Sequence, residues 1–455
     1  MRTLFFLAVI GAQAEPLSYV CKRAVGSVRV DGKLDDAAWR AAAWTAEFVD
    51  IEGDRKPKPR FRTRAKMTWD DTYFYFGAEM EEPHVWGTLT QHDSVIFRDN
   101  DCEIFLNPSG DGLNYFEFEI NALNTGWDLF LAKPYKKQGK ADNSWEMPGL
   151  LTAVHIDGTL NDARDTDRGW SVEIAIPWTA FASRAPVRRP KAGESWRVNF
   201  SRVEWRVDIR DGKYVKVPDT KEDNWVWSPQ GLIDMHVPEH WGFVKFENAD
   251  VLDRVDHLVY ATPDLARGIA EIEALLGVRA TPGGAHPGVG TRNALVALGP
   301  SSYLEIIGPD PDQPKPAEPR PFRIDELKAS KLYTWAAKAT SLDALVRAAR
   351  AERVSVGDVR QGRRQRPDGV ALSWQRTGPG TEPLVPFFID WGTSPHPSAT
   401  AARGATLVSL RGAHPHASEV MWQLDAMGLS VSVMPGNTGA LIAVIDCPKG
   451  RVELR

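Results

Sequence analysis

Eight consecutive residues at 115–122 alternate between polar and apolar side chains without a break. Successive side chains of a strand point to opposite faces of its sheet, so this alternation predicts a half-buried antiparallel strand. Its apolar back would carry Phe116, Phe118, Ile120 and Ala122, and its polar front Tyr115, Glu117, Glu119 and Asn121.

The polar front of this strand combines carboxylates and an amide, and Trp127 follows a turn-like stretch at 124–126. A sugar suits such a surface, since aromatic rings cover its flat C–H face and fixed polar groups satisfy its hydroxyls. We therefore take Tyr115, Glu117, Glu119, Asn121 and Trp127 as candidate saccharide-binding residues. The other interpretation is a solvated sheet face whose carboxylates meet Lys or Arg on neighbouring strands, as is usual in two-layer β proteins.

Glu117 and Glu119 also have the residue types of a glycosidase pair. Two residues along a strand separate them by about 6.6–6.8 Å, at the lower edge of the inverting geometry. They would lie side by side on one surface, however, and not on opposite sides of a bond. This arrangement favours binding over hydrolysis.

The length of 455 residues predicts two or three domains. A net charge of −5 does not favour nucleic acid as a partner, and no apolar run reaches the roughly 20 residues that span a bilayer. Of the 17 tryptophans, 13 lie in the first 250 residues and four in the remainder, which indicates that the two parts do different work.

Residues 1–14 have the pattern of a short secretory signal, with Arg2, an apolar stretch at 4–11 and an A-x-A site at 12–14. We therefore expect a secreted or periplasmic protein, against the alternative of an uncleaved N-terminal strand. Cys21, Cys102 and Cys447 allow at most one internal disulfide, and a Cys21–Cys102 pairing stays open.

Residues 17–249 contain many short strand patterns separated by Gly, Pro, Asn and Asp. Examples are 65–69, 73–76, 101–106 and the alternating run 170–178. This text predicts an all-β sandwich.

Four stretches of this region resemble the family-9 carbohydrate-binding modules: VDGKLDDAAW at 30–39, WDDTYFY at 69–75, DNDCEIFL at 99–106 and GWSVEIAIPW at 169–178. The resemblance implies a β-sandwich that binds a saccharide without cleaving it and traps the sugar between two tryptophans. Trp145, Trp225 and Trp227 stand in loop-like text and are our candidates for these rings, with a buried structural role as the alternative.

The same resemblance implies a structural calcium ion in this domain. The stretches 99–101 and 107–112 carry oxygen ligands of the kind that calcium takes. Neither has the spacing of an established calcium loop, so an Asx turn is the competing interpretation.

The text changes after residue 249, where helical periodicity begins to alternate with strands. A β-α-β-β(-β) order recurs three times within 254–455, and a Pro-rich connector occupies 309–321. The first pass has strands at 255–262, 293–298 and 303–307 and a helix at 264–276 that ends at Gly277. The second and third passes begin near 333 and 405. We predict an α+β domain of repeated units.

This second region resembles the glyoxalase-like domains of the vicinal-oxygen-chelate class. The resemblance rests on VDHLVYATPDL at 255–265, GGAHPGVGTRN at 283–293 and YLEIIG at 303–308. It implies paired βαβββ modules around a cavity, in which a His on the first strand and a Glu on the last strand hold a divalent metal. Those residues are His257 and Glu305 here, and the metal would be Fe, Mn, Zn or Ni acting as a Lewis acid.

The later modules depart from this pattern, since Trp335 or Thr406 stands where their His should be. Glu453 does take the place of Glu305, so His257, Glu305 and Glu453 form the predicted metal set. Glu305 or Glu453 would move a proton, and His286 would act on the substrate or supply a fourth ligand. The alternative is a metal-free domain in which His257 is a hydrogen-bonded strand residue.

The sequence thus predicts an exported protein of two domains, one binding a saccharide and one binding or transforming a small oxygenated compound. As an enzyme, the second domain would be a lyase, isomerase or dioxygenase of the vicinal-oxygen-chelate class. The alternative is a binding or scaffold protein in which neither domain turns over a substrate.

Overall fold

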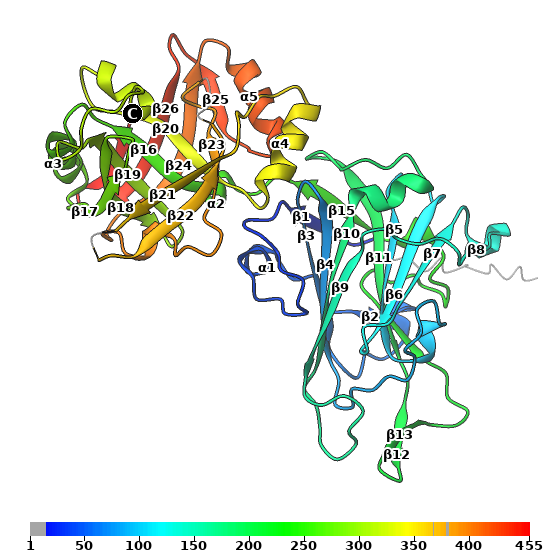
Figure 1. Ribbon diagram of the computed structural model, residues 1–455. Coiled ribbons are helices and arrows are strands. Elements are labelled where there is room, and N and C mark those ends of the chain that lie inside the picture. The colour runs from blue at the N-terminus through cyan, green and yellow to red at the C-terminus, as the bar shows by residue number, and fades with distance from the viewer. Residues whose placement is uncertain (1–14, 367, 379–381) are drawn as a thin grey trace, which may run out of the picture. The chain divides into compact units, whose positions relative to one another are not determined.

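The computed structural model describes residues 15–366, 368–378 and 382–455, so the predicted secretory signal lies outside the described residues. The chain forms two compact units, drawn in Figure 1. The N-terminal unit contains the residues before Asn248 except Val25–Ser27, and the C-terminal unit contains Val25–Ser27 and Asn248–Arg455. Each unit has its own apolar core.

The N-terminal unit is the predicted β-sandwich. Its larger sheet has nine strands in the order β1-β15-β11-β5-β6-β7-β8, and β14 and β2 continue from β11. These strands are β1 (Ser18–Lys22), β2 (Val49–Asp50), β5 (Asp101–Asn107), β6 (Tyr115–Asn121), β7 (Gly126–Leu131), β8 (Ala141–Asp142), β11 (Ser195–Glu204), β14 (Asp223–Val226) and β15 (Gly242–Glu247).

The smaller sheet has four antiparallel strands in the order β3-β4-β10-β9. A separate hairpin and one short helix complete the unit. These elements are β3 (Thr63–Trp69), β4 (Tyr73–Glu81), β9 (Leu151–Asp157), β10 (Gly169–Pro177), β12 (Val207–Arg210), β13 (Lys213–Lys216) and α1 (Ala37–Ala41).

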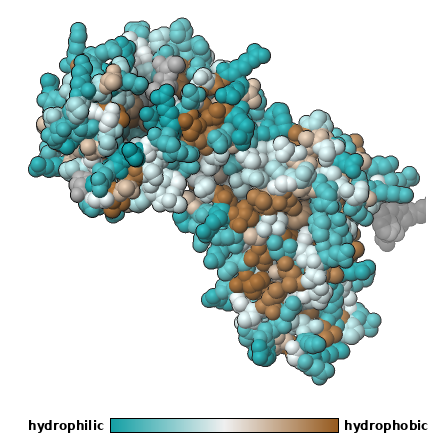
Figure 2. All heavy atoms as spheres, viewed as in Figure 1, coloured by the Kyte–Doolittle hydropathy of each residue, from teal (hydrophilic) through white to brown (hydrophobic). Residues whose placement is uncertain are grey.

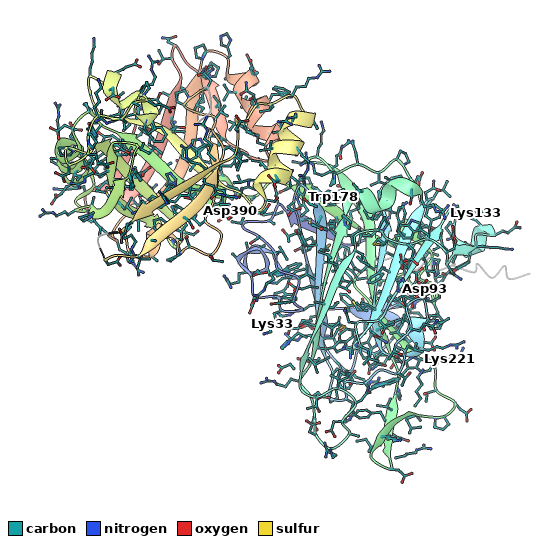
Figure 3. All side chains as sticks on the ribbon, viewed as in Figure 1. Lys33, Asp93, Lys133, Trp178, Lys221 and Asp390 are labelled. Carbon is teal, nitrogen blue, oxygen red and sulfur yellow. The ribbon has the colours of Figure 1, made fainter. Side chains whose placement is uncertain are left out.

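The core between the two sheets is rich in aromatic rings. Phe116 and Phe118 of β6 share it with Phe74 and Phe76 of β4, because the apolar faces of both strands point inward. Trp178, labelled in Figure 3, joins the same core at the end of β10. This confirms the expected apolar back of residues 115–122.

The polar front of the same strand differs from the expectation of a half-buried strand. All seven residues of β6 are buried, including Glu117 and Glu119. Residues of β7 and the segments around Phe97, Tyr135 and His236 cover this face. It is therefore the floor of a cleft and not a solvated surface.

The outer face of the smaller sheet is also covered. Trp39 of α1 is buried against Tyr75 and Ala175, and Val30 and Leu34 pack around it. Apolar residues gather on the face of the N-terminal unit that carries β4 and β9 (Figure 2). The segment before β2 therefore covers part of the outer face of the smaller sheet.

The C-terminal unit is built around a closed barrel in the order β16-β19-β18-β17-β21-β22-β23-β20. Two βαβββ modules supply four strands each, as predicted. They are β16 (Val255–Ala261), β17 (Thr281–His286), β18 (Thr291–Gly299) and β19 (Ser302–Pro309), then β20 (Lys331–Lys338), β21 (Arg360–Gln365), β22 (Ala371–Arg376) and β23 (Phe387–Asp390). Asp390 at the end of β23 is labelled in Figure 3.

The third module forms a separate sheet in the order β25-β24-β26-β27. Its strands are β24 (Thr406–His414), β25 (Ser432–Pro435), β26 (Ala440–Cys447) and β27 (Gly450–Leu454), and the helices of the unit are α2 (Val251–Arg254), α3 (Leu265–Leu276), α4 (Leu342–Ala351) and α5 (Ala417–Ala426). This sheet, the helices and the outer face of the barrel share one apolar core.

Helix α3 begins and ends where the sequence indicates. The Asp264 side chain accepts a hydrogen bond from the backbone N–H of Arg267, and Gly277 ends the helix with a φ of 72°.

The three cysteines form no disulfide, because Cys21, Cys102 and Cys447 all have free thiols. In the described part of the chain, no helix is long and apolar enough to cross a membrane.

Candidate functional sites

The first candidate site is the buried polar face of the nine-stranded sheet. The antiparallel register places Glu103 of β5 directly opposite Glu119 of β6, and Phe105 opposite Glu117. Ser201 of β11 pairs with Glu103 on its other side, and Trp127 of β7 pairs with Glu119. Side chains of one row point to the same face, so three strands bring carboxylates and one indole together.

A cleft of about 320 Å³ lies above this floor. Phe97 and Tyr135 come from short turns beside the sheet and are 38% and 45% exposed, so their rings form an accessible rim. The rings of Phe97 and Trp127 have centroids 6.4 Å apart at 32°. The lining comprises Ile51, Phe97, Glu103, Phe105, Glu117, Glu119, Trp127, Leu129, Tyr135, Val203, Glu222, Asn224, Ile233, Asp234, Met235 and His236.

Two hydrogen bonds fix the walls of the cleft. Glu119 Oε2 accepts the backbone N–H of Phe97 at 3.1 Å, which ties the ring-bearing turn to the floor. Tyr115 Oη lies 3.0 Å from His236 Nδ1. Burial lowers the pKa of His236 to about 4, so this imidazole is neutral near pH 7.

Some polar atoms of this face have no protein partner in the described residues. Glu117 Oε2 and Asp101 Oδ2 are buried acceptors without a hydrogen bond, and Trp127 Nε1 is a buried donor without one. A buried polar group that lacks a partner costs about 1–3 kcal/mol. These atoms are therefore suited to be completed by a ligand.

Burial also raises the pKa of the carboxyl groups at the floor. It raises that of Glu103 to about 7, and it raises those of Asp101, Glu117 and Glu119 well above their usual range, with neighbouring carboxylates adding to the effect in each of the last three. The charged neighbours that raise these pKa values are carboxylates themselves. The floor is thus short of positive charge.

The structure divides the residues that the sequence indicated for saccharide binding. Glu117, Glu119 and Trp127 line the cleft. Tyr115 and Asn121 lie on the same strand face but are hydrogen-bonded within the protein, Asn121 Nδ2 to Leu89 O and Asp99 Oδ2. Glu103, Phe97 and Tyr135 belong to the cleft but were missed, although the alternation in 101–105 could have placed Glu103 there.

The three tryptophans chosen from loop-like text lie elsewhere. Trp145, Trp225 and Trp227 are 2–3% exposed and belong to the core between the sheets. Trp225 stands in strand β14, and Trp145 Nε1 donates to Ser183 Oγ at 3.0 Å. A ring covered on both faces by protein has no face for a sugar, so the structure gives these side chains a packing role.

The two stretches considered for calcium are closed by internal hydrogen bonds. Asn107 Oδ1 accepts from Gly112 N, and Asp111 Oδ1 accepts from Ser109 Oγ and Leu113 N. Asp99 accepts from Thr88 and Leu89. These contacts are turn hydrogen bonds, whereas Asp101 of the first stretch keeps one oxygen, Oδ2, without a partner in the described residues.

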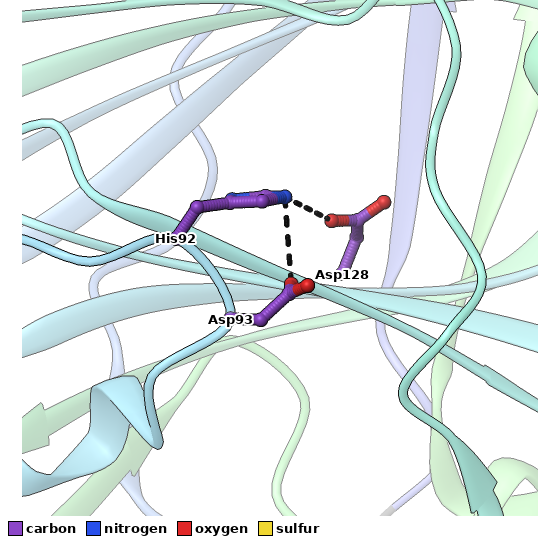
Figure 4. A group of neighbouring side chains, drawn as sticks. All are labelled: His92, Asp93 and Asp128. Atoms are coloured by element: carbon purple, nitrogen blue, oxygen red, sulfur yellow. Dashed lines mark ion pairs between the residues drawn. The ribbon is translucent and has the colours of Figure 1, made fainter.

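Among the described residues, two groups have ligand atoms within 4.8 Å of one another, the separation at which a single ion can be shared. One is Asp101, Glu103 and Glu119 on the cleft floor. The other, shown in Figure 4, is His92, Asp93 and Asp128, with His92 Nε2 at 3.4 Å from an oxygen of each aspartate. His92 is half-exposed and also pairs with Glu146, which is the arrangement of a surface ion-pair cluster.

The second candidate site is a cavity of about 310 Å³ inside the barrel of the C-terminal unit. Its wall contains His257, His286, Asn293, Tyr303, Glu305, Arg364, Trp374, Arg376, Phe387 and Trp391, among others. His257 and Glu305 stand on the adjacent parallel strands β16 and β19, and His257 Nε2 lies 3.7 Å from Glu305 Oε2. The predicted His–Glu pair is therefore brought together.

A bulge in β16 aims this histidine. The pairing of β16 with β20 slips between Val255 and His257, which allows Asp256 and His257 to be neighbours on one side of the strand. His257 Nδ1 lies 2.7 Å from Asp256 Oδ1. Asp256 Oδ2 also lies 3.1 Å from Trp391 Nε1 and 3.2 Å from His396 Nε2.

These contacts decide the tautomer of His257. Burial raises the pKa of Asp256, but hydrogen bonds from His257 and His396 outweigh burial and hold that pKa well below its usual range. An ionised carboxylate only accepts, so His257 Nδ1 carries the proton of this hydrogen bond. Its Nε2 is then the atom that faces Glu305 and the cavity, and the ring stacks on Tyr303 at 4.7 Å.

Glu305 and His286 are linked through an amide. Asn293 Nδ2 donates to Glu305 Oε1 at 2.5 Å, and His286 Nε2 lies 3.5 Å from the same amide nitrogen. Burial lowers the pKa of His286, so its imidazole is neutral. His286 therefore belongs to the cavity wall, and Asn293 lies between it and Glu305.

Two arginines add positive charge to this cavity. Arg364 of β21 is buried and donates to Gly283 O, and Arg376 of β22 donates to Thr377 O at 3.1 Å. Burial lowers the pKa of both guanidiniums, although neither loses its charge at neutral pH. Sequence reasoning missed both, because only the closed barrel brings β21 and β22 opposite His257.

Glu453 does not join this cavity. It lies on β27 of the third module, where Arg411 Nη2 binds one oxygen at 2.5 Å and Arg455 Nε binds the other at 2.6 Å. In the described residues, β20 and β23 supply no His or Glu in place of His257 and Glu305. Of the predicted metal set, the cavity thus presents His257 and Glu305, whereas catalytic zinc sites keep three protein ligands. This donor set does not complete a metal centre.

Comparison with known proteins agrees with this division. Residues 30–230 match the family model "Carbohydrate family 9 binding domain-like", and residues 255–428 match "Glyoxalase-like domain". The exoglucanase XynX of Acetivibrio thermocellus is 24% identical over 156 residues, which are 34% of this chain and 12% of that enzyme. The chain spans about an eighth of the length of the curated relatives it matches.

Two solved structures are similar to parts of this chain. A family-9 carbohydrate-binding module from Caldicellulosiruptor kristjanssonii, in complex with glucose, is 16% identical with a TM-score of 0.34, covering 51% of this chain and 97% of that one. The methylmalonyl-CoA epimerase of Mycobacterium tuberculosis is 18% identical with a TM-score of 0.24, covering 32% and 91%. By the two family matches, a carbohydrate family 9 binding-like domain at 30–230 is followed by a glyoxalase-like domain at 255–428.

Proposed function

We propose that this chain is an exported protein that binds a saccharide in the cleft of its N-terminal unit and a small oxygenated anion in the barrel of its C-terminal unit. The observation that carries the first part is that the residues lining the cleft include an unpartnered donor, Trp127 Nε1, and an unpartnered acceptor, Glu117 Oε2. The hydroxyls of a sugar both donate and accept, so they are suited to both atoms.

The rim supports the same ligand. Aromatic rings line the cleft beside its carboxylates, namely those of Phe97, Trp127 and Tyr135. A sugar also has both kinds of surface, because its C–H face is apolar and its hydroxyls are polar. The related exoglucanase and the glucose-bound module point to the same class of ligand. Glu117 and Glu119 line one floor side by side, so we assign them to binding and not to hydrolysis.

Isothermal titration of the whole protein with glucose, cellobiose and cellotriose tests this part. Trp127→Ala should abolish binding, and Trp422→Ala is the matched control because that ring is 50% exposed on the C-terminal unit. Equal affinities of both variants would contradict the assignment of the cleft.

For the C-terminal unit, the paired guanidiniums of Arg364 and Arg376 favour a ligand with a carboxylate or phosphate group. His257 Nε2, aimed by Asp256, and Glu305 are placed to take and return a proton at that ligand. The catalytic form of this proposal is a lyase or isomerase reaction, and the alternative is binding without turnover.

A divalent Fe, Mn, Zn or Ni ion on His257 and Glu305 is a separate version of the proposal, and no step here runs through it because the donor set is incomplete. Metal analysis of the purified protein tests it directly. One equivalent of tightly held metal, lost in His257→Ala and retained in Glu453→Gln, would establish a metal site at the pair. A structural calcium ion in the N-terminal unit would appear in the same measurement.

Export rests on the signal-like residues 1–14 and on the exported character that a saccharide-binding role favours. Fractionation of cells that express the full chain tests it. Mass spectrometry of the product should find an N-terminus at Glu15 in the exported fraction.

A further inference from the structure

The saccharide cleft of the N-terminal unit has an unusual charge. Five carboxylates line it, namely Glu103, Glu117, Glu119, Glu222 and Asp234, and no lysine or arginine is among the described lining residues. A neutral sugar would satisfy hydrogen bonds but supply no positive charge to these carboxyl groups. Buried carboxylates in proteins are normally paired with a cation.

The strand register concentrates this charge. Glu103 and Glu119 face one another across β5 and β6, and like charges directly opposite destabilise a sheet. Asp101, Glu103 and Glu119 each place an oxygen within 4.8 Å of the others. Three acceptors around one ammonium nitrogen, each at about 2.8 Å, are separated by about 4.6 Å in tetrahedral geometry.

Unpartnered atoms mark where the cation belongs. Asp101 and Glu117 are at least 97% buried, and Asp101 Oδ2 and Glu117 Oε2 have no hydrogen-bond partner in the described residues. Burial and the neighbouring carboxylates raise the pKa of Glu117 and Glu119, as expected of a floor without its counter-charge.

We infer that the cleft selects a saccharide that carries a protonated amine, with the ammonium group between Glu103 and Glu119, beside the unpartnered oxygens of Asp101 and Glu117, and the sugar ring against Phe97 and Trp127. The inference rests on the proposed saccharide function and names the class of sugar. A bare divalent ion would use the floor and leave the aromatic rim without a role, whereas an amino sugar uses both.

The test compares sugars that differ in the amine alone. Full-length protein is titrated with glucosamine and chitobiose, then with their N-acetylated forms and with cellobiose, and Trp fluorescence reports binding. We expect the free amines to bind at least tenfold more tightly. Glu117→Gln should remove this preference, while Glu47→Gln, an exposed acid outside the cleft, should leave it unchanged.

Equal affinity for amines and for their acetylated forms would overturn the inference and leave saccharide binding intact. Loss of all sugar binding would instead refute the proposed function itself. A parallel titration with CaCl₂ provides a further check. Calcium binding at the floor combined with no amine preference would assign the site to a metal, whereas competition between calcium and glucosamine would support a cation site used by the amine.

Discussion

His257 and Glu305 lie on neighbouring parallel strands with Nε2 and Oε2 3.7 Å apart, so the two groups point at one place without bonding each other directly. Asp256 holds the other side of the imidazole through Nδ1. The pair therefore depends on a residue that does not line the cavity.

Replacing this aspartate should switch the histidine tautomer. In Asp256→Asn, the amide NH₂ donates to Nδ1, so the ring proton moves to Nε2 and faces Glu305. Nitrogen NMR of labelled protein would show the exchange of protonated nitrogen at His257. The variant should also lose about 1–3 kcal/mol of stability, because Trp391 and His396 use the same carboxylate. An unchanged tautomer would show that Asp256 does not set it.

The barrel arginines should govern anion affinity. Arg376→Gln is expected to weaken the binding of a dicarboxylate probe such as malonate by about tenfold, which corresponds to roughly 1.4 kcal/mol. Thermal-shift titration measures this. Arg411→Gln is the matched control, since Arg411 pairs with Glu453 on the third sheet. A loss of the same size in both variants would indicate a general charge effect.

Two tryptophans of the N-terminal unit should respond differently to removal. Trp225→Ala should cost about 3–5 kcal/mol of unfolding free energy, because the ring is 3% exposed and packs in the core. Trp127→Ala should change stability far less and should lose sugar affinity. Urea unfolding and titration with cellobiose separate the two effects. A large stability loss at Trp127 would contradict its position on the cleft wall.

Acid should weaken the N-terminal unit through His236. Burial lowers the pKa of this imidazole to about 4, against about 6.5 in an unfolded chain. The unfolded state therefore binds the proton first, and the contribution is fully present above pH 6.5 and is lost as the pH falls toward 4. We expect a loss of up to about 3 kcal/mol over this window.

His236→Gln provides the comparison, because an amide both donates and accepts and can keep the hydrogen bond to Tyr115 Oη. Urea unfolding followed by Trp fluorescence between pH 4 and 7 should give a shallower acid slope for the variant. Parallel curves for the two proteins would assign the acid sensitivity to other groups, such as the carboxyls of the cleft floor.

The sequence predicted much of the architecture, for reasons that particular residues explain. The alternation at 115–122 and the caps Asp264 and Gly277 act over a few residues, so local patterns identify them. Burial of Glu117 depends on segments around residues 97, 135 and 236, which are distant in the chain. No local pattern reports such coverage.

The misplaced candidates have the same cause. Trp225 stands among turn residues in the sequence, yet pairing of β14 with β11 and β2 brings it into the sandwich. Glu453 occupies the right position within its own module, but that module lies outside the barrel. Similarity within a single module therefore identified His257 and Glu305. It could not predict which two of the three modules form the barrel.

Closure of the barrel explains why the third βαβββ module forms a separate sheet. Eight strands from two copies complete the ring, and a ring offers no free edge to which another strand can add. The third module therefore packs against the outer face of the barrel, and its helix and strands share the apolar core there. Side chains of the third module therefore do not line the barrel cavity. Its Glu453 forms ion pairs with Arg411 and Arg455 instead of contacting a ligand there.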